Sequence, residues 1–127
     1  MHQRTEIIGF LGSKPELQYT NKGEPVTNFS VATSHKRSNS SGEYVTETTW
    51  WRVSAFGRTA ENATKYLDKG SKVMIAGRLV SDPSTGGPKV YQKKDGVWAA
   101  SFDIIASEVV FLSSKGDNNA SAEDVWG

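Results

Sequence analysis

The chain of 127 residues has no cysteine and only two histidines, His2 and His35. Without cysteine there are no disulfide bonds, thiolate metal ligands or cysteine nucleophiles. Both histidines fall in segments that we expect to be exposed. A zinc site is therefore not expected, because zinc takes its ligands mainly from Cys and His. The sequence predicts no metal, no cofactor and no catalytic residue.

Long apolar runs are absent as well. No stretch approaches the roughly 20 apolar residues that a membrane-spanning helix needs. Residues 1–6 carry neither the apolar core of a signal peptide nor the composition of a transit peptide. We therefore expect a cytoplasmic protein in a reducing compartment.

Recognisable catalytic motifs are missing too. The sequence has no phosphate-binding glycine loop, no nucleophile placed beside a base and no cluster of metal ligands. We interpret scattered carboxylates such as Glu43, Glu47 and Asp103 as solvated surface. An enzyme is therefore the alternative that the sequence favours least.

The charges are distributed unevenly along the chain. Residues 1–116 contain all 15 Lys and Arg and 11 of the 14 Asp and Glu, a net charge of +4. The remaining residues contain Asp117, Glu123 and Asp124 and no basic side chain. A basic body followed by an acidic tail fits a protein that binds polyanions, although +4 by itself is ordinary for a soluble domain.

The strongest local signal lies in residues 48–58. Their β-branched and aromatic side chains and the lack of proline predict a strand. Alternation along a strand places Trp50, Arg52 and Phe56 on one face and Trp51 on the other. Flat rings with a cation between them suit stacking on nucleobases together with neutralisation of phosphates. The alternative is that these rings belong to a second packed layer.

The rest of the chain predicts more strands, separated by turn-forming clusters. Gly9 allows a bend in the first strand, and Phe29 and Val31 are expected to face inward. Lys36 and Arg37 are expected on a mobile polar loop over residues 35–42. The predicted extended segments are residues 5–11, 16–20, 25–34, 43–56, 71–80, 90–94 and 97–112.

A helix is predicted between the third and fourth long strands. Apolar residues recur there at helical spacing from Ala60 to Leu67. Thr59 is predicted as the N-cap and Glu61 falls in the first turn, where the helix dipole favours a carboxylate. Gly70 is predicted as the C-terminal cap.

Five long antiparallel strands with one helix between the third and fourth form the arrangement of the OB-fold, a small five-stranded Greek-key barrel. We expect this all-β domain to cover residues 1–113, and residues 114–127 to be a short, acidic, disordered tail. OB-folds bind ligands across their second and third strands and beneath their connecting loops. The candidates on those parts are Trp50, Arg52, Phe56, Lys36, Arg37, Lys89, Tyr91, Lys93, Lys94 and Trp98.

Four stretches carry more specific patterns. They are Ile-Ile-Gly-Phe-Leu-Gly-x-x-Pro-Glu-Leu at 7–17, Asn-Phe-Ser-Val-Ala-Thr at 28–33, Trp-x-Arg-Val-x-x-Phe-Gly at 50–57, and a segment from Ala60-Glu61 to Gly77-Arg78-Leu79. In order and spacing they resemble the bacterial-type single-stranded DNA-binding protein (SSB) family. The final strand matches more loosely.

The resemblance implies a homotetramer of OB-folds, cytoplasmic and nucleoid-associated. Such a protein would coat and protect single-stranded DNA in DNA replication, recombination and repair, independently of sequence and without catalysis. By position, Trp50 and Phe56 match the family's base-stacking aromatics. Trp51 falls where the family makes subunit contacts. The basic candidates near the DNA path are Arg52, Arg58, Lys69 and Arg78.

The sequence departs from the family in its loops. The family often has a stacking tryptophan in the second–third hairpin, where this chain has Lys36-Arg37, so phosphate contact is expected to replace stacking there. The connection over residues 81–97 is longer and richer in Gly and Pro than usual. Tyr91 and Trp98 are therefore candidates by their position alone.

The last residues depart from the family too. Family tails usually end in acidic residues and a Pro-Phe tip that docks replication and repair enzymes. This sequence has Glu123, Asp124, Val125 and Trp126 before its final Gly127, which keeps carboxylates beside one hydrophobic anchor. A docking segment for partner proteins is one interpretation, and an inert tail is the other.

One non-enzymatic alternative remains open. Aromatic rings with interspersed polar groups on an OB-fold also suit other ligands. Structured RNA, an oligosaccharide or a partner protein would each fit such a surface.

Overall fold

The computed structural model describes residues 1–113, which form seven strands and one helix. The tail expected over residues 114–127, with its docking candidates Glu123, Asp124, Val125 and Trp126, lies outside the described residues. The elements are β1 (Thr5–Leu11), β2 (Glu16–Tyr19), β3 (Pro25–Ser38), β4 (Tyr44–Phe56), α1 (Gly57–Tyr66), β5 (Lys72–Val80), β6 (Lys89–Gln92) and β7 (Trp98–Phe111).

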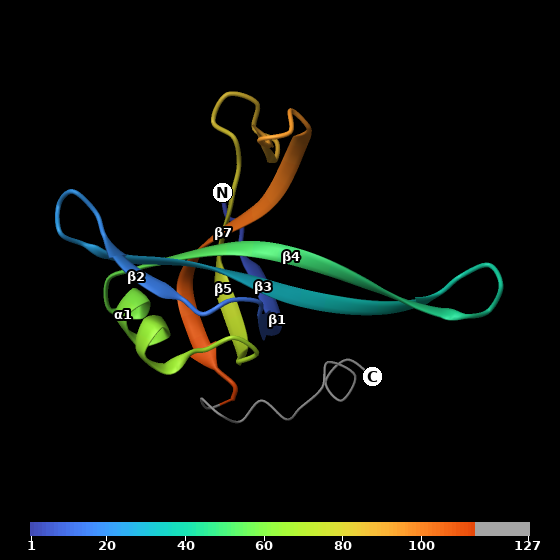
Figure 1. The fold of residues 1–127 in the computed structure, drawn as a ribbon, viewed down its shortest axis with the longest axis horizontal. Helices are drawn as coiled ribbons and strands as arrows, with labels where there is room; N and C mark the ends of the chain where they lie inside the picture. Colours follow the sequence, from blue (N-terminus) through green and yellow to red (C-terminus); the bar gives the residue numbers. More distant parts are fainter. Residues whose placement is uncertain (114–127) are drawn as a thin grey trace.

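Within residues 1–113, the five longest strands close into a barrel in the order β1-β5-β7-β4-β3, and β3 returns to β1. The helix follows the third of these strands, as predicted for an OB-fold. The short strands β2 and β6 pair with β3 and β7 respectively. Figure 1 shows the β3–β4 hairpin and the segment around β6 leaving the barrel in different directions.

One pairing differs from the expectation of five antiparallel strands. β4 and β7 run parallel, with Trp51 opposite Phe102 and Ser54 opposite Ile105. Parallel neighbours need a long crossover connection, and here α1, β5 and β6 lie between them in the chain. The pair closes the barrel with strands that are distant in sequence.

The β3–β4 hairpin is longer than predicted. Its ladder runs from Val26 opposite Phe56 to Ser38 opposite Tyr44, so the first half of the predicted mobile loop, residues 35–38, is strand and residues 39–42 form the turn. The tip is held by Asn39, whose side-chain oxygen accepts bonds from the N–H groups of Ser41 and Glu43, each at 3.0 Å. Polar composition suggested a loop, but the backbone ladder continues through these polar residues.

The ends of α1 also differ from the prediction. The helix begins at Gly57, and the residue before it, Phe56, is extended and provides no side-chain cap. Thr59 therefore lies inside the helix and Glu61 is not in the first turn. The helix ends at Tyr66, and the N–H of Leu67 donates to the Ala63 carbonyl. Gly70 is in the following connection, where its N–H donates to the Leu11 carbonyl at 2.8 Å.

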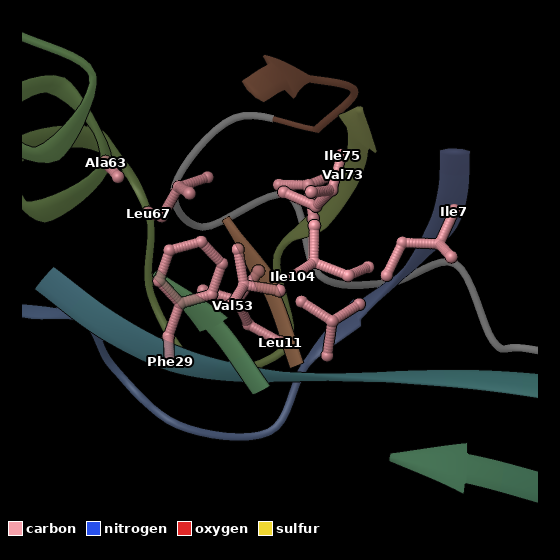
Figure 2. Close-up of a cluster of buried hydrophobic side chains, with 10 residues drawn as sticks. Ile7, Leu11, Phe29, Val53, Ala63, Leu67, Val73, Ile75 and Ile104 are labelled. Carbon is pink, nitrogen blue, oxygen red and sulfur yellow. The ribbon is translucent and has the colours of Figure 1, made fainter. Parts of the chain in front are cut away.

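The core lies inside the barrel and under α1 (Figure 2). Alternation along β3 points Phe29 and Val31 inward, as predicted, and both are buried. Val53 fills the same core from β4, and Ile104 does so from β7. The cluster of buried side chains is Ile7, Leu11, Phe29, Val31, Val53, Ala63, Leu67, Val73, Ile75 and Ile104.

Residues 1–113 contain neither a membrane-spanning helix nor a cluster of metal ligands. The only helix in this range, α1, has 10 residues, and no helix there is long and apolar enough to span a membrane. The same residues contain no group of three or more His, Asp or Glu side chains placed to hold a metal ion.

The buried position of Leu67 generates a test of this core. Leu67 is fully buried, so we expect Leu67→Ala to lower the free energy of unfolding by about 2–5 kcal/mol, through lost burial and the cavity left behind. Urea denaturation followed by circular dichroism would measure it. Leu112 is 44% exposed, and Leu112→Ala is the matched control, expected to change much less. Equal losses in the two variants would contradict this packing.

Candidate nucleic-acid interface

The two faces of β4 have opposite environments, as alternation predicts. Val53 and Ala55 are buried, whereas Trp50 and Phe56 are 55% and 39% exposed and Arg52 is also exposed. Among residues 1–113, no second layer covers these rings. We call the exposed side of β4, and the side chains of neighbouring strands that share it, the outer face.

Register extends the outer face across three strands. Arg52 lies opposite Ser30 on β3 and opposite Asp103 on β7. Ser54 lies opposite Asn28, and its hydroxyl donates to Asn28 Oδ1 at 2.6 Å. Trp50 and Phe56 lie on either side of this polar region along β4. Trp50 is four residues before Ser54, and Phe56 is two residues after it.

Two hollows lie on or beside this surface. The first has a volume of about 210 Å³ and is lined on β4 by Arg52 and Ser54, the two outer-face residues between Trp50 and Phe56 along the strand. The second, of about 290 Å³, continues towards β2. Asn28 lines both, so the two adjoin. The first is lined by Asn28, Phe29, Ser30, Arg52, Ser54 and Asp103, and the second by Ser13, Lys14, Glu16, Gln18 and Asn28.

The ring of Trp50 rests against Gly12. A Cβ atom added at Gly12 would lie 2.5 Å from Trp50 Cζ3 and 2.9 Å from Ser30 Oγ. Such distances are too short for a real contact, so glycine is what lets the indole lie in this position. The turn after β1 therefore supports one side of the ring and leaves its remainder exposed.

Lys36 and Arg37, predicted as a pair, lie on opposite faces of β3. Lys36 lies opposite Thr46, which places it on the outer face with Trp50. Arg37 is on the other face, where its Nε forms an ion pair with Glu47. Only Lys36 therefore has its charge on the same side as the exposed rings.

The side chains of Tyr91 and Trp98 likewise lie on opposite faces of their sheet. Trp98 lies directly opposite Gln92, the residue after Tyr91, so the two aromatic side chains leave opposite faces of the β6–β7 hairpin. Alternation along β7 places Trp98 with Phe102 and places Tyr91 with Asp103 on the outer face. Both rings are exposed, at 42% for Tyr91 and 65% for Trp98.

The remaining basic candidates are spread around this region. Arg58 is exposed in the first turn of α1, two residues after Phe56. Arg78 on β5 lies opposite Ile105, which itself lies opposite Ser54, so Arg78 also points to the outer face. The other exposed or half-buried cations are Lys69 in the α1–β5 connection, Lys89 on β6, and Lys93 and Lys94 at the turn after it.

Trp51 is half-buried on the side of β4 opposite the outer face. Its indole Nε1 donates to Thr33 Oγ1 at 2.9 Å, and its ring centroid is 5.5 Å from that of Phe102. It packs against the core cluster of its own barrel. A role in contacts between subunits stays a prediction.

The structure adds residues that the sequence did not single out. Tyr44 is 79% exposed and shares the face of β4 that carries Trp50. The alternation of side chains along the predicted strand could have placed it there from the sequence alone. Asp103, interpreted as solvated surface, is half-buried. Its Oδ1 is shielded from solvent and has no hydrogen-bond partner among the described residues. Glu47 is engaged with Arg37.

The loop between β5 and β6 is organised by Asp82. The hydroxyl of Ser84 donates to Asp82 Oδ1 at 2.7 Å, and the Ser84 N–H donates to the same oxygen at 2.9 Å. The hydroxyl bond is the first cause that lowers the pKa of the Asp82 carboxyl, and the backbone bond is the second. The Asp82 N–H also donates to the Gly87 carbonyl, so this part of the long connection is a closed turn.

Comparison with known proteins identifies the family. The family model for the "Single-strand binding protein family" matches residues 2–112. The chain belongs to this family. It is 38% identical to a single-stranded DNA-binding protein of Neisseria meningitidis serogroup A over 91% of the chain, and 38% identical to one of Xanthomonas campestris over 87%. It spans 63% and 60% of the length of those relatives.

A solved structure shares the fold of this chain. The structure, titled "Plasmodium falciparum SSB complex with ssDNA", superposes with a TM-score of 0.71 at 24% sequence identity. The match covers 89% of this chain and 97% of that one. At this level of identity the match establishes the shared fold, which for this member of the single-strand binding protein family is the OB-fold barrel described above.

The contact between Gly12 and Trp50 generates a prediction for this family member. We expect Gly12→Ala to move the Trp50 ring, because the new methyl group would occupy the position of the indole edge. Fluorine NMR of the fluorotryptophan-labelled protein would then show one shifted resonance among the four tryptophans. Gly87→Ala is the control, since its added Cβ meets only Thr85 Oγ1, at 3.7 Å. An unchanged Trp50 resonance in Gly12→Ala would contradict the contact between Gly12 and the Trp50 ring.

Proposed function

We propose that this protein binds single-stranded DNA without overall sequence preference and protects it during DNA replication, recombination and repair. The observation that carries the proposal is the outer face of β4, where two exposed rings, Trp50 and Phe56, flank the exposed cation Arg52. Membership of the single-strand binding protein family supports the same conclusion. The proposed activity is binding, without catalysis.

Two physical contributions make up the proposed binding free energy. Cations that neutralise phosphates release counterions from the strand, which gives affinity that falls with salt and does not depend on sequence. Aromatic rings stack on unpaired bases, each contributing roughly 1–3 kcal/mol by alanine substitution. A duplex keeps its bases stacked on each other, so the stacking term selects single strands.

Several further properties are proposed from the family resemblance. The OB-fold of residues 1–113 is the DNA-binding domain, and four copies form a homotetramer in which Trp51 contributes to subunit contacts. Residues 114–127 act as an acidic tail, and Glu123, Asp124, Val125 and Trp126 dock replication or repair proteins. The protein works in the cytoplasm, on the nucleoid. Light scattering of the purified protein, with and without a long oligo-dT, tests the tetramer.

Ligands other than single-stranded DNA can be tested in the same experiment. Polar and aromatic side chains on an OB-fold also suit oligosaccharides or structured RNA. Titration of tryptophan fluorescence with oligo-dT, duplex DNA and an oligosaccharide separates these cases. Response to oligo-dT at low salt, with little response to the other two, is the result expected here.

The two terms predict different salt behaviour for substitutions on one strand. We expect Trp50→Ala and Phe56→Ala each to weaken binding of oligo-dT by roughly 1–3 kcal/mol and to leave the salt dependence unchanged, because no charge is removed. Arg52→Ala should instead reduce the slope of log affinity against log salt by about 0.7, the value for one phosphate contact on a single strand. Fluorescence titrations over a salt series measure both. Identical slopes in all three variants would refute this division.

The opposite directions of Tyr91 and Trp98 give a second prediction. Tyr91 shares the outer face with the exposed rings of β4, and Trp98 does not. We therefore propose that Tyr91, rather than Trp98, stacks on a base. Tyr91→Ala should weaken oligo-dT binding by roughly 1–3 kcal/mol, and Trp98→Ala, the matched control on the same hairpin, should have little effect. A larger loss in Trp98→Ala would reverse the assignment.

A further inference from the structure

A carboxylate lies in the middle of the proposed DNA-binding surface. Asp103 is on β7, directly opposite Arg52 on β4, and both line the first of the two hollows. A negative charge at this place opposes phosphate binding, so phosphate neutralisation does not account for it. Its position beside the bases that would stack on the two rings suggests contact with a base edge.

The hydrogen bonding of Asp103 is incomplete. Its Oδ1 is shielded from solvent, and no donor within residues 1–113 bonds to it, so a ligand in the hollow can reach only the other carboxylate oxygen, Oδ2. A shielded acceptor without a donor is unfavourable, and a carboxylate only accepts hydrogen bonds. Arg52, its neighbour, is exposed and makes no ion pair within the described residues, so its guanidinium is available to a ligand.

Two of the other side chains that line the hollow, Asn28 and Arg52, can donate hydrogen bonds to a ligand. Asn28 Oδ1 accepts from the Ser54 hydroxyl, which leaves the Asn28 amide hydrogens available, and Arg52 adds the donors of its guanidinium. A ligand that matches the hollow must therefore present a donor towards Asp103 and acceptors towards Arg52 and Asn28. The ligand must carry this donor and these acceptors along a single edge.

Cytosine presents this pattern on the edge that is free in a single strand. Its exocyclic amino group donates, and its ring nitrogen N3 and carbonyl O2 accept; pairing of Asp with the cytosine amino group is an established mode of base recognition. Uracil and thymine carry a carbonyl oxygen in place of the amino group, which a carboxylate repels. We propose that this hollow is a base-reading subsite in which Asp103 accepts from the cytosine amino group while Arg52 and Asn28 donate to N3 and O2.

The subsite rests on the proposed function, and it adds a preference to binding that otherwise ignores sequence. One base in each OB-fold is read, while the bases on the aromatic rings are held by stacking. Asp103 thereby determines specificity, at a cost to phosphate attraction.

The test compares oligo-dC with oligo-dU, which differ only at the base edge. We expect the wild-type protein, above neutral pH so that cytosine stays unprotonated, to bind oligo-dC about fivefold tighter, the lower end of the contribution of one specific pair. Asp103→Asn should abolish or reverse this preference, because the amide can donate to the uracil carbonyl. Glu61→Gln, which removes the same charge from an exposed position on α1, should retain it.

A second probe uses the unaltered protein. An oligomer of the pyrimidinone analogue, which is cytosine without its amino group, should lose the advantage of oligo-dC. Tight binding of both oligomers with no preference, or an equal change for both in Asp103→Asn, would overturn the subsite and leave the proposed function standing. Failure to bind either oligomer at low salt would overturn both.

Discussion

The pairing of β4 between β3 and β7 is the constraint on which the rest of this surface depends. Val53 is held in the core by its neighbours on both strands, and its burial decides which side of β4 faces solvent. A slip of one residue would turn Trp50 and Phe56 inward and bring Val53 to the surface. The hydrophobic effect on one face of the strand thus fixes the position of the binding chemistry on the other.

The same register gathers side chains from distant parts of the chain. Lys36 near the tip of β3 and Tyr91 on the β6–β7 hairpin share the side of the sheet that carries Trp50. Gly12, in the turn after β1, lies against the edge of that indole. Rings, cations and one carboxylate therefore share one side of the sheet, although no local stretch of sequence contains more than a few of them.

The sequence predicted what depends on local pattern. The exposed side of β4 that carries Trp50 and Phe56, the inward Phe29 and the OB-fold class all follow from alternation and element order. Pairing between strands could not be predicted, so Arg37 and Trp98 were grouped with residues on the opposite face. Nothing in the sequence around Asp103 indicates that one of its carboxylate oxygens is shielded from solvent. The helix begins at Gly57 without a side-chain cap, so no capping residue marked its start.

The parallel contact between β4 and β7 has a consequence for how the molecule is made. Residues 51–54 meet residues 102–105, so the barrel stays open until nearly all of the described chain has left the ribosome. Until then β4 and β5 each have an unpaired edge, which favours association with other chains. Non-local closure of this kind also slows folding. Nascent chains of this protein are therefore expected to spend their most aggregation-prone interval just before synthesis of the last strand.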